Sequence, residues 1–457
     1  MKHEAKYAIL DQIKNIHFIG IGGVSMSSLA QILFKRGYAV SGSDRSSSAV
    51  LDNMSMMGIR IDHGHDAENV GMAQAVVYTA AIPDGNPELC EARKRGIPIF
   101  TRAELLGWLM LDYRLRIGVA GTHGKSTTTS MLAMILMKAD VNPTVLSGAD
   151  LAAMGGSYRI GGDEYFLFEA CEYKDSFLSF CPTTAIIGNV ELDHTDYFPS
   201  LAAMERSFST YLRGSEIAVI NADDEAAMRT GKDYDGRIVT FGIDADADYR
   251  AEHITYSGLR CSFVLSVRGE KKGSISLSVP GRHNVLNALA ACAAAMENGI
   301  SFEDVSAGLA LFAGAGRRFD FAGMLNGAPV YDDYAHHPSE IRATLEAAKA
   351  MDRRVVCVFQ PHTFSRTHEL FDDFVRALSA ADLLCIAEIF AAREENRWNV
   401  SSSKLAAAID GAICLGDFDA IASWLMREVR EDDLVLIMGA GDVNRLTRML
   451  NLTSKCE

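Results

Sequence analysis

Long apolar runs and paired cysteines are both missing from this sequence. The most apolar helical stretch, 284–296, is short and rich in alanine, which indicates a buried helix and not a membrane span. The first twenty residues mix charges through their apolar positions, so they do not resemble a signal peptide. The nine cysteines are scattered without a C-x-x-C pair, a pattern typical of a reducing compartment. We therefore expect a cytoplasmic protein with no membrane partner.

Positive charge is also scarce. The chain has 44 lysines and arginines against 59 acidic residues, for a formal net charge of -15. Such a balance argues against nucleic acid as a partner, because binding to the phosphate backbone needs clustered cations. It leaves room for a small anionic substrate, which a few local cations and backbone amides can hold.

The length of 457 residues predicts two to three domains, and 48% hydrophobic with 23% charged residues is an ordinary globular composition. Short apolar runs alternate with helical patterns, which indicates an α/β fold with parallel strands. New units begin near Arg114 and near Gly314. Between about 236 and 280 the pattern changes, and we expect antiparallel strands there at 237–243, 261–267 and 274–280.

The stretch GVAGTHGKSTTTSML, residues 118–132, has the features of a phosphate-binding loop. A strand leads into a turn at Gly121 and Gly124, whose backbone N–H groups would face an anion at the start of a helix. Lys125 would reach the terminal phosphates of a nucleoside triphosphate. The first glycine of the usual G-x4-G-K-[ST] spacing is displaced by one position, so the loop is a relative of that motif. The hydroxyls suited to Mg²⁺ are those of Ser126 and Thr127.

A second glycine turn, GIGGVS at 20–25, follows the first predicted strand and opens a helix. Asp44 ends the next strand at the distance expected of a dinucleotide fingerprint, although Ser25 stands at the third glycine position. A plain tight turn would explain the pattern as well. The turn therefore predicts a diphosphate site without identifying NAD.

Acids and histidines follow several predicted strands, at the sheet edge where α/β proteins present ligands. The acids and the histidine expected beside the phosphate loop are Glu169, Glu172, Glu191, Asp193, His194 and Asp196. As a cluster they predict ligands for a magnesium–nucleotide complex. The pair His336 and His337 could bind a metal, but Pro338 makes a helix start the simpler interpretation. His362 and Arg366 follow another strand, in a site or in an ordinary surface loop.

Taken together, the motifs resemble one family. They are GTHGKSTTT, NVELDHTDYF, PGRHNVLNALAA, RRFD, DDYAHHPSEI, FQPHTFSRT and MGAGDV, joined by HFIGIGG, SGSD and NPEL. Their types and order are similar to those of the Mur ligases of bacterial cell-wall synthesis, from about residue 15 to 446. GTHGKS and DDYAHHP carry the resemblance, because GIGG alone is common.

The resemblance implies three α/β domains: a Rossmann-like domain for a UDP sugar (1–113), a central P-loop-type domain for ATP (114–315) and a Rossmann-like domain for an amino acid (316–457). It implies ATP and Mg²⁺ as co-substrate and cofactor. Among the family's reactions, it points to the joining of L-alanine to UDP-N-acetylmuramate through an acyl phosphate. As an assembly we expect a monomer or a homodimer.

Matching motifs also imply roles for individual residues. Those expected to take part in catalysis are Lys125, Glu169, His194 and Arg318. Those expected to contact ATP are Gly121, Thr122, His123, Gly124, Lys125, Ser126, Thr127, Asn284 and Arg318. The implied metal ligands are Ser126, Glu169 and His194. The implied UDP-sugar contacts are Gly20, Gly22, Gly23 and Asp44, and the implied alanine pocket is Tyr334, His362 and Arg366.

The chain departs from the family pattern in two places. Ser25 and Ser28 stand where relatives often carry glycine, and the segment 200–214 contains no lysine, which relatives use, carbamoylated, to bridge metals. Three other functions remain open. A NAD-dependent dehydrogenase would leave GTHGKS unused, and a non-catalytic nucleotide switch would leave the third unit's polar residues unexplained. A later-step or peptide-recycling ligase of the same family would differ in its acceptor.

Overall fold

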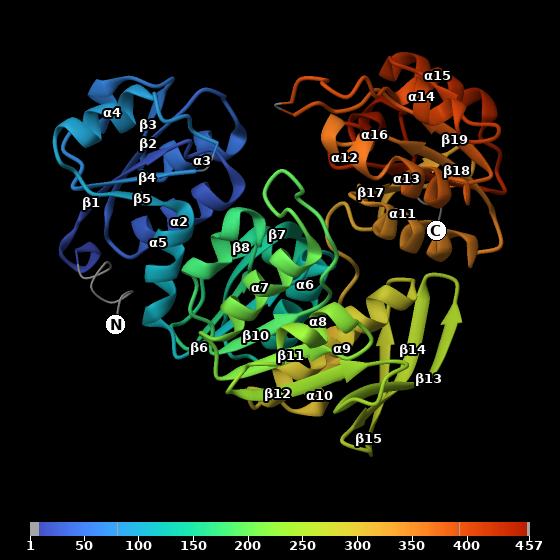
Figure 1. Cartoon of the computed structure of the whole chain (residues 1–457), viewed down its shortest axis with the longest axis horizontal. Coiled ribbons are helices and arrows are strands. Elements are labelled where there is room, and N and C mark those ends of the chain that lie inside the picture. Colours follow the sequence, from blue (N-terminus) through green and yellow to red (C-terminus); the bar gives the residue numbers. More distant parts are fainter. Residues whose placement is uncertain (1–8, 80, 393, 455–457) are drawn as a thin grey trace.

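Three β-sheets follow one another along the chain, each flanked by helices, in this computed structural model (Figure 1). The structure describes residues 9–79, 81–392 and 394–454. The N-terminal unit and the C-terminal unit stand on either side of the larger central unit (Figure 1). The predicted α/β class with three units is confirmed. Among the described residues, no helix has the length and apolar character to span a bilayer.

The N-terminal sheet is fully parallel, with the strand order β3-β2-β1-β4-β5. This order places a reversal between β1 and β4, and ligands of such sheets bind beyond the strand ends at that point. Its elements are β1(Asn15–Ile19), α2(Val24–Lys35), β2(Ala39–Asp44), α3(Ala49–Met56), β3(Arg60–His63), β4(Ala75–Tyr78), α4(Pro87–Lys94), β5(Ile99–Thr101) and α5(Arg102–Leu109).

The central sheet has the order β15-β14-β13-β12-β11-β10-β6-β9-β7-β8. Its strands are β6(Leu115–Ala120), β7(Thr144–Leu151), β8(Gly156–Arg159), β9(Tyr165–Glu169), β10(Thr184–Ile187), β11(Ile217–Asn221), β12(Arg237–Gly242), β13(Tyr249–Ser257), β14(Arg260–Val267) and β15(Glu270–Leu277). Its helices are α6(Lys125–Lys138), α7(Leu201–Leu212), α8(Glu225–Thr230), α9(Arg282–Glu297) and α10(Phe302–Ala310).

One prediction for this sheet is wrong. The segment 237–243 is not antiparallel: β12 pairs parallel with β11, and also parallel with the start of β13. The cause is α8, which carries the chain back across the sheet between β11 and β12, so that β12 starts at the same edge as β11. Only β13, β14 and β15 form the antiparallel extension that the pattern predicted.

Small residues let the helices of the central unit pack closely. The alanines of α9 between Ala288 and Ala295 are almost fully buried, and α9 contacts α6. Gly308 of α10 lies so near α6 that an added Cβ would be 2.5 Å from the Cα of Ile135. This packing fixes α6, whose first residue is Lys125, relative to the sheet.

The C-terminal sheet has the order β16-β17-β21-β18-β19-β20, with β16 antiparallel to β17 and the other pairs parallel. Its strands are β16(Asp320–Leu325), β17(Ala328–Asp333), β18(Arg354–Phe359), β19(Leu383–Ile386), β20(Ile413–Cys414) and β21(Asp433–Met438). Its helices are α11(Pro338–Lys349), α12(Phe364–Glu369), α13(Phe371–Leu378), α14(Ser402–Ala407), α15(Phe418–Glu428) and α16(Arg445–Met449).

Candidate active site

The loop between β6 and α6 is fixed by hydrogen bonds with the loop that follows β10. The N–H of Thr122 donates to the Asn189 carbonyl at 3.0 Å, and the N–H of His123 donates to the Asn189 side chain at 2.8 Å. Gly124 has φ +77, and an added Cβ would lie 2.5 Å from Oδ1 of Asn287, so glycine is required there. The donors left for an anion include the first N–H groups of α6, beginning at Lys125.

Lys125 lies inside this loop and contacts a buried acid. Its Nζ donates to the carbonyls of Gly121 at 2.6 Å and Thr122 at 3.0 Å, and lies 3.0 Å from Oε2 of Glu172. The side chain of Glu172 is 1% exposed. Burial by itself would lower the pKa of Lys125, but the nearby acids, Glu172 foremost and Glu169 with it, together outweigh burial and raise it. Lys125 is therefore a fixed cation at the start of α6.

The predicted metal ligands fall into two neighbouring pairs. Ser126 Oγ donates to Glu169 Oε2 at 2.7 Å, whereas His194 Nε2 lies 3.5 Å from Oε1 of Glu172. Burial tends to raise the pKa of Glu172, but the nearby Lys125 and His194 hold it below its usual value, so the carboxylate is charged. Hydroxyl and carboxylate oxygens are the donors that Mg²⁺ prefers, so this set fits the ion. Glu172, one acid of the predicted cluster, is the one that lies buried between Lys125 and His194.

A cavity of about 290 Å³ opens beside the phosphate loop, between the central and C-terminal units. It is lined by the predicted residues His123, Gly124, Thr127, Asn284 and Arg318. It is also lined by residues that the motifs did not single out, among them Asn221, Phe241, His283 and Asn287. Its apolar wall and few amide groups suit a planar base, with the phosphates directed to the start of α6.

The residues predicted to bind the amino acid lie close together in the C-terminal unit. The ring centroids of Tyr334 and His336 are 5.4 Å apart, and those of His336 and His362 are 5.9 Å apart. Nη1 of Arg366 lies 3.4 Å from Nδ1 of His362. The guanidinium of Arg318 stacks 4.7 Å from the centroid of the Tyr334 ring, so the phosphate and amino-acid groups are neighbours.

Arg366 already holds a carboxylate in this structure. Its Nη2 donates to both oxygens of Asp193, at 2.8 and 3.2 Å, and both side chains are nearly buried. Burial opposes the charge on Asp193, but the guanidinium lowers its pKa well below the usual value. Asp193 belongs to the central unit, so this pair joins the two units across the site. A guanidinium in this setting recognises a carboxylate through a charge-assisted pair.

Two imidazoles beside Arg366 are neutral. Burial lowers the pKa of His336 to about 3, and burial together with the Arg366 charge lowers that of His362 to about 4. Asp333 positions this region, because its carboxylate accepts the N–H groups of Phe319 and Ala335, both at 2.7 Å. The strand end and the loop that carries Arg318 are thereby fixed to each other.

Comparison with known proteins identifies the family. Three family models match in order: "Mur ligase family, catalytic domain" at 15–114, "Mur ligase middle domain" at 119–295, and "Mur ligase, glutamate ligase domain" at 317–441. The UDP-N-acetylmuramate–L-alanine ligase of Clostridium novyi is 44% identical over 96% of this chain and 97% of its own length. That of Lachnospira eligens is 46% identical over 94% and 96%. The chain belongs to the Mur ligase family.

Solved structures agree with this assignment. The UDP-N-acetylmuramate–alanine ligase of Thermotoga maritima matches with a TM-score of 0.81 and 30% identity, over 95% of this chain and 98% of that one. A murein peptide ligase of Psychrobacter arcticus matches with a TM-score of 0.71 and 27% identity, over 96% and 98%. The fold and the order of the three units in this Mur ligase are therefore those of solved members.

In this Mur ligase the glycine turn of the first unit is largely satisfied within the chain. The N–H of Gly20 donates to the Ser43 carbonyl at 2.8 Å, and that of Gly22 donates to Oδ2 of Asp44 at 2.9 Å. The N–H of Gly23 donates to the Gly20 carbonyl at 3.3 Å. Asp44 thus holds the turn, and the donors that remain for a diphosphate lie at the start of α2. The role of these residues in sugar binding stays a prediction.

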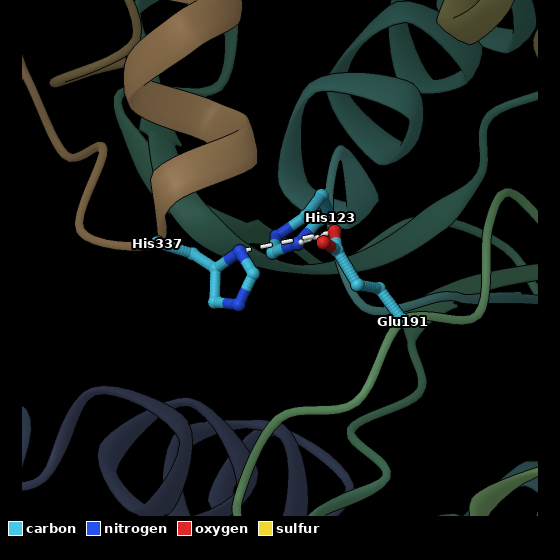
Figure 2. A group of neighbouring side chains, drawn as sticks. All are labelled: His123, Glu191 and His337. Carbon is cyan, nitrogen blue, oxygen red and sulfur yellow. Dashed lines mark hydrogen bonds and ion pairs between the residues drawn. The ribbon is translucent and has the colours of Figure 1, made fainter. Parts of the chain in front are cut away.

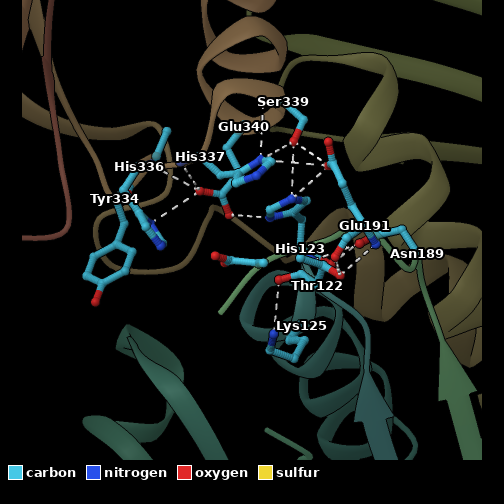
Figure 3. A network of polar contacts seen from close by, with 12 residues as sticks. Thr122, His123, Lys125, Asn189, Glu191, Tyr334, His336, His337, Ser339 and Glu340 are labelled. Carbon is cyan, nitrogen blue, oxygen red and sulfur yellow. Dashed lines mark hydrogen bonds and ion pairs between the residues drawn. The ribbon is translucent and has the colours of Figure 1, made fainter. Parts of the chain in front are cut away.

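Two contacts of this site were not predicted from the sequence. Glu172 was one acid among many, and only its burial beside Lys125 distinguishes it. His123 was expected to contact ATP, yet its ring also contacts Glu340 of α11, 217 positions along the chain (Figure 3). The E in DDYAHHPSE was the available signal, as it reads as the N3 acid of a helix. It does occupy that position in the capping box of α11.

Proposed function

We propose that this Mur ligase joins L-alanine to the lactyl carboxylate of UDP-N-acetylmuramate, with hydrolysis of ATP to ADP and phosphate, in peptidoglycan precursor synthesis. Its similarity to ligases of this name over nearly the whole chain is the observation that carries the proposal. The site supports it, because a phosphate loop, Arg318 and the carboxylate-binding guanidinium of Arg366 lie at one boundary between units. We assign residues 1–113 to the UDP sugar, 114–315 to ATP and 316–457 to the amino acid.

In the first step an oxygen of the lactyl carboxylate attacks the γ-phosphorus of ATP. The bond from that phosphorus to the bridging oxygen breaks, and its electron pair leaves with ADP. Two anions approach each other in this step, so cations are needed. Lys125 at the start of α6 and Arg318 at the cavity wall are placed to supply them. Ser126, Glu169 and His194, with Glu172 beside them, would hold a Mg²⁺ ion bound with ATP, which would supply further positive charge.

In the second step the nitrogen of L-alanine attacks the carbonyl carbon of the acyl phosphate. The bond from this carbon to the phosphate oxygen breaks and inorganic phosphate leaves. Of the three protons on the alanine ammonium group, two pass to solvent and one stays on the amide nitrogen. Arg366 would exchange Asp193 for the alanine carboxylate and so place the amine. The imidazoles of His336 and His362 are neutral here, and their lowered pKa values make them weak bases, so they are suited to accept a hydrogen bond from the amine and not its proton.

The nucleotide substrates imply a cytoplasmic reaction. The UDP diphosphate would lie at the start of α2, where the glycine turn ends, with its sugar directed toward the central unit. Contact between these units is direct, since Tyr158 of β8 donates to Oε1 of Gln31 in α2 at 2.5 Å. The substrates of three units must meet, so domain closure belongs to the cycle.

Phosphate release tests this function. The enzyme would receive ATP, Mg²⁺ and UDP-N-acetylmuramate, with L-alanine, glycine, L-serine or L-Ala-γ-D-Glu-meso-diaminopimelate. We expect release that requires both the sugar and L-alanine, with a new amide product. Release with the tripeptide alone would replace the proposal by a murein peptide ligase. No phosphate release with any of these acceptors would leave only a nucleotide-binding module.

A further inference from the structure

Three side chains from distant segments meet between the central and C-terminal units, apart from the magnesium ligands described above (Figure 2). His123 precedes α6, Glu191 follows β10, and His337 is the N-cap of α11. We call them the interdomain histidine cluster. Each offers one ligand atom, and these atoms all lie within 4.8 Å of one another.

Two of the three spacings between these atoms approach the spacing around a metal ion. Oε2 of Glu191 lies 3.1 Å from Nε2 of His123 and 3.8 Å from Nδ1 of His337. Zinc with bonds of about 2.0–2.2 Å in a tetrahedron separates its ligand atoms by roughly 3.3–3.5 Å. The space between the three atoms is polar, because Oγ of Ser339 lies 2.6 Å from Glu191 Oε2, 2.6 Å from His337 Nδ1 and 3.1 Å from His123 Nε2.

The groups behind the cluster orient it. Nδ1 of His123 contacts Oε1 of Glu340 at 3.0 Å, which directs Nε2 toward Glu191 and Ser339 (Figure 3). A carboxylate on the far nitrogen of a histidine is the usual partner of a metal-binding imidazole. Nδ1 of His337 accepts the N–H of Ser339 at 3.4 Å as the cap of α11, so a metal ion at this nitrogen would replace that contact. The side chain of His337 is 3% exposed.

We propose that the interdomain histidine cluster binds one divalent transition-metal ion, with Zn²⁺ the best suited. Two imidazoles and one carboxylate are the ligands of many zinc sites, and imidazole favours zinc over magnesium. The ion takes the place of the Ser339 hydroxyl, which rotates away, and a water completes the four ligands. Binding also displaces the proton from Nε2 of His123.

Such an ion would tie the phosphate loop to α11. His123 adjoins Gly124 and Lys125, and it lines the nucleotide cavity together with Glu191 and Ser339. Because two ligands belong to the central unit and one to the C-terminal unit, the bound ion holds the closed arrangement. We therefore expect Zn²⁺ to slow turnover by hindering reopening. Metal binding itself does not depend on the proposed reaction.

The test titrates Co²⁺ into the full chain without nucleotide, sugar or Mg²⁺. We expect one equivalent to bind with the visible absorption of a four- or five-coordinate nitrogen and oxygen site, and Zn²⁺ to displace it. Thiolate ligands would show as an intense near-ultraviolet charge-transfer band, so this spectrum separates the cluster from the cysteines. Zn²⁺ alone should raise the unfolding temperature.

Variants then assign the site. His337→Asn keeps an oxygen for the helix cap but removes the imidazole, and should weaken binding by about 100-fold or more; Glu340→Gln should weaken it by about 10–100-fold. Glu169→Gln at the magnesium site and His253→Ala at an exposed position of β13 should bind Co²⁺ as the wild type does. A thiolate band, no tight Co²⁺ site in the wild type, or unchanged binding in His337→Asn would each overturn the proposal.

Discussion

Removing the ammonium group of Lys125 should lower both the stability and the activity of the enzyme. A second variant should restore the stability but not the activity. Nζ of Lys125 lies 3.0 Å from Oε2 of Glu172, and the two side chains are 14% and 1% exposed. Removing one partner of a buried pair costs about 3–5 kcal/mol, because the other charge stays buried. His194, 3.5 Å from Glu172, offsets part of that cost, so we expect the lower end.

Lys125→Ala should therefore lower the free energy of unfolding by about 3 kcal/mol. In a domain of the size of the central unit each kcal/mol lowers the unfolding temperature by about 2–4 °C, so the variant should unfold about 6–12 °C below the wild type. Lys125→Ala combined with Glu172→Gln no longer buries a lone charge and should recover most of that loss. Neither variant should release phosphate from ATP. Calorimetry and phosphate release measure the two effects. A shift below about 1 °C in the single variant, or no recovery in the double variant, would refute the reasoning.

Three further predictions concern other parts of the site. Arg366→Ala should raise the KM for L-alanine by at least about 30-fold while changing the KM for ATP far less, and equal changes in initial-rate kinetics would remove Arg366 from the amino-acid pocket. Gly124→Ala should weaken ATP binding in calorimetry, because its Cβ would lie 2.5 Å from a side-chain oxygen; Gly155→Ala, also at positive φ but with open space, is the control and should leave ATP affinity unchanged. Burial opposes the charge on His123, but the carboxylates of Glu340 and Glu191 raise the pKa of its imidazole from 6.5 to about 9. The stability that this contact contributes is therefore complete below pH 6.5 and is lost as the pH rises through about 9. The difference in unfolding temperature between wild type and Glu340→Gln should shrink over that interval, and a difference independent of pH would contradict the assignment.

Local patterns predicted most of the fold. The strand, glycine turn and helix at 118–132 depend on neighbouring residues, so the sequence was sufficient to place Lys125 at the start of α6. The alanine-rich segment 284–296 was likewise expected to be a buried helix, and α9 is one. The direction of β12 was mispredicted because its residues suit either pairing, and the crossover through α8 decides it.

The contacts of the site were harder to predict because they join distant segments. Arg366 and Asp193 are 173 positions apart, and nothing local to either residue indicates that they pair. Glu169 and Glu172 are both acids at the end of one strand, yet only Glu172 becomes buried against Lys125. His337 was expected to start a helix, which it does, but its contact with the phosphate-loop histidine depends on how two units dock.

The central claim is that the lactyl carboxylate of UDP-N-acetylmuramate is activated by the γ-phosphate of ATP and then joined to L-alanine. Labelling both oxygens of that carboxylate with ¹⁸O tests it directly, with mass spectrometry of the phosphate and of the amide product. Our account predicts one ¹⁸O in each phosphate released and one retained in each amide. Phosphate without label, or release of phosphate without UDP-N-acetylmuramoyl-L-alanine, would contradict it.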